Sequence, residues 1–84
     1  AAYNLGSLYF RGEGVPRDVS LAAQWFLHAA HQNHRKAQMD YGFMRILGVG
    51  VAVDRADGIQ WLTRAAQDPA TFAQVKEKMA LLCG

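Results

Sequence analysis

The sequence predicts an all-α fold of about five helices, arranged as two copies of a helical hairpin followed by one further helix. Three observations predict this architecture. The chain repeats itself at an offset of 36 residues, its apolar residues recur at three- and four-residue spacing, and each copy carries the same glycine-rich turn. Repetition at a period of roughly 20 to 50 residues is typical of solenoids, because each unit buries its apolar face only against its neighbours.

The internal repeat defines the domain organisation. Residues 1–36 align with residues 37–72, and ten positions are identical. The identical pairs are Ala1 and Ala37, Gly6 and Gly42, Gly12 and Gly48, Gly14 and Gly50, Val15 and Val51, Asp18 and Asp54, Gln24 and Gln60, Trp25 and Trp61, Ala29 and Ala65, and Ala30 and Ala66. We therefore expect one continuous solenoid, with repeats at 1–36 and 37–72 and a partial third repeat or capping helix at 73–84.

Each copy reads as two helices joined by a glycine turn. The expected helices lie near residues 1–11, 19–32, 35–47, 55–67 and 70–82. In the first helix, Leu5 and Leu8 share one stripe with Ala1 and Gly12, a spacing that predicts a helix running to about Arg11. In the second, Trp25 recurs with alanines at helical spacing. We expect both Trp25 and Trp61 to be buried between helices.

Glycines and aspartates mark the helix ends. Gly12 and Gly14 suit a helix stop and a sharp reversal, because glycine adopts positive φ at little cost. An aspartate then caps each following helix by accepting hydrogen bonds from its first turn, and Asp68 before Pro69 predicts the same for the last helix. The pattern assigns structural roles to ten residues: Gly6, Gly12, Gly14, Asp18, Trp25, Gly42, Gly48, Gly50, Asp54 and Trp61. Gly6 and Gly42, inside helical segments, predict close helix-to-helix approach.

These residues resemble a known family. The run from Ala1 to Asp18, continued by Ala22, Trp25-Phe26 and Ala29-Ala30, is similar to the Sel-1-like repeat, a relative of tetratricopeptide repeats. The second copy departs at Arg45, Gly58 and Pro69, where the first has Tyr9, Ala22 and Asn33. The resemblance implies a right-handed α/α superhelix and a role as an adaptor that assembles protein complexes. It also points to bacterial proteins of the envelope, the periplasm or the outside of the cell, including those of host interaction, and to eukaryotic proteins of membrane-protein quality control.

Composition excludes several classes of function. The chain has 84 residues, a formal charge of +2 and a pI near 9.0, but its basic residues are scattered, so we expect no nucleic-acid partner. No apolar run approaches the roughly 20 residues of a membrane span. The single cysteine, Cys83, offers no disulfide or zinc spacing within the chain. The chain opens without methionine inside an apparent helix, so we expect a longer parent protein.

Two features resemble functional sites without their required context. Gly12-Glu13-Gly14 precedes a helix as a phosphate loop does, yet no strand or lysine accompanies it, which favours a structural turn. His28, His31 and His34 are spaced three apart, but the second copy has no counterparts, which favours a solvated helix end over a metal site. With no nucleophile motif or paired carboxylates, we expect no catalytic residue, no cofactor and no metal.

The expected function is therefore a protein-protein interaction scaffold that binds a protein or peptide on its concave face, lined by the first helix of each repeat. Positions that differ between copies are the candidate contacts, because the identical ones are explained by packing and turns. They are Tyr3, Asn4, Ser7, Arg11, Met39, Asp40, Phe43 and Leu47. Packing of Phe43 on the third repeat is the competing interpretation. The alternative function is self-association through exposed solenoid ends, giving a homodimer.

Overall fold

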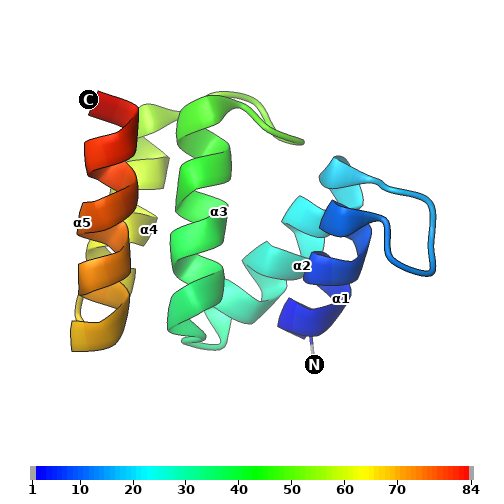
Figure 1. The fold of residues 1–84 in the computed structure, drawn as a ribbon, viewed down its shortest axis with the longest axis horizontal. Coiled ribbons are helices and arrows are strands. Elements are labelled where there is room, and N and C mark those ends of the chain that lie inside the picture. Colours follow the sequence, from blue (N-terminus) through cyan, green and yellow to red (C-terminus); the bar gives the residue numbers. More distant parts are fainter. Residues whose placement is uncertain (1, 84) are drawn as a thin grey trace.

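The computed structural model describes residues 2–83, with the backbone alone for residues 82 and 83; Ala1 and the side chain of Cys83 lie outside the described part. Five α-helices and no strand occur within it (Figure 1). The helices are α1 (Ala2–Arg11), α2 (Val19–His31), α3 (Arg35–Leu47), α4 (Arg55–Ala65) and α5 (Pro69–Cys83). The all-α prediction is confirmed, and each expected helix end lies within two residues of the observed one.

The helices pack in chain order. α1 lies against α2, α2 against α3, and α3 against α4, while α5 contacts both α3 and α4. Figure 1 shows α3, α4 and α5 gathered at one end of the molecule and α1 with α2 at the other. Because most contacts join neighbouring helices, the architecture is that of a short solenoid, in which each helical pair covers the next.

The centre of the first core is α2, whose alanines let helices approach on both sides. Ala22, Ala29 and Ala30 are buried, together with the ring of Phe26. A Cβ on Gly6 of α1 would lie only 2.8 Å from that ring, so the expected close approach at this glycine is confirmed. The backbone carbonyl oxygen of Ala22 would lie 3.2 Å from the same Cβ. A second core, between α3, α4 and α5, contains Met39, Phe43, Leu62, Ala65 and Val75.

The predicted helix caps are present. Oδ1 of Asp18 accepts a hydrogen bond from the backbone N–H of Leu21 at 3.0 Å, and Asp54 does the same for Asp57 at 3.0 Å. Asp68 accepts from both the backbone N–H and the hydroxyl of Thr71, which fixes the start of α5 at Pro69. A fourth cap was not predicted: Nδ1 of His34 accepts from the N–H of Ala37 and begins α3.

The two glycine turns share a backbone conformation but differ in their surroundings. Gly14 has a φ of +75° and Gly50 a φ of +72°, as the positive-φ expectation requires. A Cβ on Gly14 would meet nothing within 4 Å. A Cβ on Gly50 would overlap the backbone carbonyl of Val19, because the second turn lies against the start of α2. The second turn is therefore also a contact between repeats.

The apolar stripe of α1 is only partly covered. Leu8 is 37% exposed, and Leu5 is exposed to the same extent, whereas Met44, the counterpart of Leu8 in the second repeat, is 5% exposed. The difference arises because α3 is covered by α2 on one side and by α4 on the other, whereas α2 is the one helix that packs extensively on α1 in the described chain. Trp25 follows the same rule: it is only partly buried, while Trp61 is 6% exposed, so the expectation of two buried tryptophans holds for Trp61 alone.

Candidate binding groove

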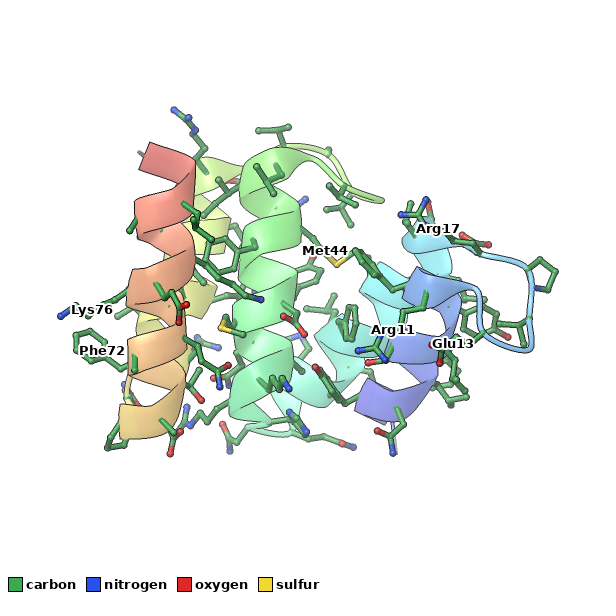
Figure 2. The ribbon with its side chains drawn as sticks, in the orientation of Figure 1. Arg11, Glu13, Arg17, Met44, Phe72 and Lys76 are labelled. Carbon is green, nitrogen blue, oxygen red and sulfur yellow. The ribbon has the colours of Figure 1, made fainter. Side chains whose placement is uncertain are left out.

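A groove of about 560 Å³ lies between α1, α3 and α5, the first helices of the successive repeats. Its apolar lining comes from these three helices, from Phe26 of α2 and from the turn after α3. The apolar residues are Phe10, Phe26, Phe43, Met44, Leu47, Val49 and Leu81. Figure 2 shows Met44 pointing from α3 toward α1 and α2. The groove thus lies on the face that the sequence analysis assigned to the first helix of each repeat.

The polar lining centres on one hydrogen bond between repeats. The hydroxyl of Tyr3 on α1 donates to Oδ2 of Asp40 on α3 at 2.9 Å. The ammonium of Lys78 on α5 lies 3.9 Å from Oδ1 of the same carboxylate. The Tyr3 ring stacks on the His34 ring with centroids 4.6 Å apart, and the Lys36 ammonium lies 5.9 Å from the tyrosine ring centroid. Three helices are therefore joined through Asp40.

Burial perturbs both partners of this bond. Desolvation, followed by the charge of Asp40 and the hydrogen bond to it, raises the pKa of Tyr3 to about 12. Desolvation also raises the pKa of Asp40, and this effect outweighs the opposing influence of the Tyr3 hydroxyl and of the Lys78 and Lys36 charges. The neutral hydroxyl and the charged carboxylate therefore share a poorly solvated site.

Positive charge dominates the groove. Arg11, Lys36 and Lys78 line it, and Asp40 is the one carboxylate among its lining residues in the described chain. Figure 2 shows Arg11 extending from α1 into the space facing α3. Within residues 2–83, Arg11 makes no side-chain hydrogen bond or ion pair. Asp40 accepts a hydrogen bond from Tyr3 and interacts with the charges of both Lys78 and Lys36, so this single carboxylate offsets only part of the three positive charges.

The structure brings together most of the candidate contact residues. Six of them line the groove: Tyr3, Ser7, Arg11, Asp40, Phe43 and Leu47. Asn4 is exposed on α1 but is not part of the lining.

Two candidates need correction. Met39 is fully buried in the core between α3, α4 and α5, because its side chain points away from the groove, so no partner can touch it in this conformation. Phe43 is 8% exposed and packs in the same core as Val75 of α5. Of the two interpretations offered for Phe43, this burial favours packing on the third repeat.

Several lining residues were not predicted. Lys36 lies one helical turn before Asp40, and this spacing of four residues was the signal that they share a face. Phe10 and Met44 also face the groove, and neither is among the candidate contacts. The presence of Lys78 and Leu81 in the groove could not be predicted from the sequence. It depends on how α5 packs against the other helices, and residue spacing within α5 does not determine that packing.

The features set aside in the sequence have structural roles. His34 caps α3, His31 contacts the Trp61 ring edge-on at 5.2 Å, and His28 lies beside Trp25. In the part of the chain that the structure describes, no three His, Cys, Asp or Glu side chains are grouped so as to hold a metal. No described helix is long and apolar enough to span a membrane.

Helical pairs that stack through their first helices, with glycine turns and aspartate caps repeated in each pair, define an α/α repeat solenoid. The Sel1 repeat family matches residues 1–34 and 35–68, so the chain belongs to the Sel1 repeat family.

Similar proteins come from eukaryotes and bacteria. Chitin synthase regulatory factor 3 of Schizosaccharomyces pombe is 35% identical over 94% of the chain. A putative ERAD-associated E3 ubiquitin-protein ligase component of the same yeast is 33% identical over 100% of the chain. The ERAD-associated E3 ubiquitin-protein ligase component HRD3A of Arabidopsis thaliana is 35% identical over 64% of it. The chain spans only 8%, 12% and 8% of these three proteins, respectively.

Two solved structures share the fold. A Sel1 repeat protein from Oxalobacter formigenes superposes with a TM-score of 0.83 at 32% identity, over 96% of this chain and 32% of that protein. A protective antigen of uropathogenic Escherichia coli, described as displaying an SLR fold, gives a TM-score of 0.76 at 41% identity, over 79% of this chain and 14% of the antigen.

Proposed function

We propose that the chain is a non-enzymatic adaptor module that holds a segment of another protein in the groove between α1, α3 and α5. The observation that carries this proposal is the composition of the groove: an apolar lining combined with charged residues from three separate helices. An apolar centre with a polar rim is typical of protein recognition surfaces. The groove volume falls within the range of sites that take a few side chains.

The relatives support a role exercised through other proteins. One is named as a regulatory factor of chitin synthase and two as components of ubiquitin ligases. A component and a regulator both act by contacting a partner.

The perturbed Tyr3 and Asp40 do not favour catalysis over binding. Perturbed pKa values occur in active sites and also in structural networks. Here both shifts have burial as their largest cause, and the two groups are bonded to each other across the repeat boundary. A structural bridge accounts for that geometry without a substrate.

A random-peptide display library, selected on the 84-residue chain, tests the proposal. Peptides that bind the wild type are measured against Ser7→Trp, which places a large ring in the groove, and against Ser20→Trp, which places it on an exposed part of α2 outside the groove. We expect Ser7→Trp to abolish binding and Ser20→Trp to retain it, with circular dichroism showing both variants helical. Peptides that bind all three proteins equally would refute the groove as the binding site.

Self-association is the second candidate function, and the exposed stripe of α1 favours it. Leu5 and Leu8 present apolar side chains that their counterparts in the second repeat bury. Exposed apolar patches of this kind are typical of association sites. Sedimentation velocity on the wild type and on Leu8→Lys decides: a dimer that Leu8→Lys dissociates supports this function, and a monomeric wild type rejects it.

A further inference from the structure

We propose that the groove selects an acidic peptide segment, in which one or more Asp or Glu side chains sit against Arg11, Lys36 and Lys78 and an adjacent apolar side chain packs on the apolar lining. This inference rests on the proposed function and specifies the chemistry of the partner. It goes beyond the fold, because the helical solenoid by itself carries no charge preference.

The first step of the argument is the convergence of cations. Arg11, Lys36 and Lys78 come from α1, α3 and α5, so three elements separate in the sequence bring positive charge to one hollow. Like charges gathered in one place repel one another and raise the free energy of the empty site. An anionic ligand would relieve that repulsion, and apolar walls strengthen the attraction by lowering the local dielectric.

The second step is that the protein itself neutralises these charges only in part, since one carboxylate faces three cations. Asp40 is 3.9 Å from Lys78, at the limit of an ion pair, and its other oxygen accepts from Tyr3. Arg45, on the same helix as Asp40, shows the contrast: its guanidinium is held by Asp57 at 3.0 Å and lies 3.6 Å from Asp54. Arg11 has no such partner among the described residues and remains available for a bidentate bond to a ligand carboxylate.

The third step concerns the apolar contribution. Leu47 and Leu81 line the groove and are both largely exposed. A ligand apolar side chain lying on them would remove this surface from water at roughly 25 cal/mol per Å² of apolar area. Charge alone would favour any polyanion, including nucleic acid. The combination of cations with exposed leucines favours a polypeptide that alternates acidic and apolar side chains.

The experiment extends the display selection to the charges. Peptides are selected on the wild type, and the strongest binder is synthesised in two forms, as selected and with each Asp or Glu replaced by Asn or Gln. Affinities are measured by fluorescence anisotropy at low and at high sodium chloride. The test protein is the Arg11→Gln, Lys78→Gln double variant. The matched control is Arg55→Gln, Lys76→Gln, which removes the same charges from exposed positions outside the groove; Figure 2 shows Lys76 on the outer side of α5.

We expect the selected peptides to be rich in Asp or Glu next to an apolar residue. The groove double variant should weaken binding about tenfold or more, and the amide form of the peptide should bind the wild type about equally weakly. The control variant should bind like the wild type, and the affinity of the wild type should fall with salt.

The outcomes separate the two proposals. The selected peptides could be neutral or basic, and could bind the groove double variant but not Ser7→Trp. That result would overturn the acidic preference and leave the adaptor function intact. Peptides that Ser7→Trp does not affect would overturn the adaptor function, and the acidic preference with it. Equal losses in the groove and control double variants would show only the effect of net charge and would also overturn the acidic preference.

Discussion

Tyr3 of α1 donates its hydroxyl hydrogen to Asp40 of α3, and this 2.9 Å bond joins the first repeat to the second through the groove. The internal repeat does not predict this bond. The second copy has Met39 at the position equivalent to Tyr3, and the first copy has Asn4 at the position equivalent to Asp40. Its formation places a carboxylate where desolvation raises the pKa of that group.

Asp40→Asn should make the protein as stable as the wild type or more stable at neutral pH. The folded state holds the Asp40 proton more tightly than the unfolded chain does, where the pKa is near 3.8. Asp40 therefore contributes most to stability at pH values below its pKa in the unfolded chain. This contribution is lost as the pH rises through the raised pKa of the folded state. Asparagine keeps an acceptor for Tyr3 and stays neutral. Urea unfolding at neutral and acidic pH should show the advantage of Asp40→Asn shrinking toward low pH; a pH-independent loss would contradict the prediction.

Tyr3 should titrate at about 12 rather than at the ordinary 10.0. The folded state holds this proton more tightly as well, so stability is lost as pH rises from about 10 to about 12. Ultraviolet absorbance of the phenolate measures the step, and Tyr3→Phe should remove it. In Asp40→Asn the step should move to lower pH, because the neighbouring negative charge is gone. An unmoved step would show that this charge has no effect on Tyr3.

Equivalent positions in the two repeats should respond differently to the same truncation. Met44→Ala removes a side chain covered by α2 and should cost about 2 to 4 kcal/mol of unfolding free energy. Leu8→Ala, at the same repeat position, should cost about 1 kcal/mol, because its side chain is already partly in water. Chemical denaturation measures both. Equal losses would mean that α1 is covered in solution, for example by a second copy of the chain.

The two tryptophans should also differ. Trp61 is buried against Tyr41 and His31, and Trp61→Ala should cost about 3 to 5 kcal/mol. Trp25→Ala should cost less, since Trp25 is only partly buried and its indole N–H has no hydrogen-bond partner among the described residues. Thermal unfolding monitored by circular dichroism compares the two, and a Trp25→Ala loss as large as that of Trp61→Ala would contradict this account.

The glycine turns give a third matched pair. Gly14→Ala should cost about 1 kcal/mol, from the strain of positive φ alone, because its Cβ would meet open space. Gly50→Ala carries the same strain and adds a clash with the Val19 backbone, so it should cost about 2 kcal/mol or more. Added nucleotide should leave the melting temperature of the wild-type chain unchanged. A rise that Gly14→Ala abolishes would instead indicate a phosphate site.

Local chemistry explains which parts of the fold were predictable. The caps at Asp18, Asp54 and Asp68 and the positive φ of Gly14 and Gly50 depend on a few neighbouring residues, so sequence spacing was sufficient. The cap at His34 could not be predicted in this way, because histidine is not among the residues that commonly cap helices.

The parts that could not be predicted depend on contacts between elements. Leu8 and Met44 have the same repeat position and similar side chains, yet their exposure differs because of what covers each helix. Likewise, nothing in the spacing of α5 places Lys78 beside Asp40. The sequence was sufficient to predict that a binding face would involve α1 and α3. It was not sufficient to predict that this face would be positively charged.

The fit of Gly50 against Val19 has a consequence for how the chain unfolds. A turn that rests on the preceding repeat cannot rearrange without disturbing the start of α2. In repeat proteins, such nearest-neighbour terms decide whether units melt singly or together. With this contact added to the bond between Tyr3 and Asp40, the two repeats should melt cooperatively in a single step, and amide hydrogens of α2 and α3 should exchange with the same free energy of opening.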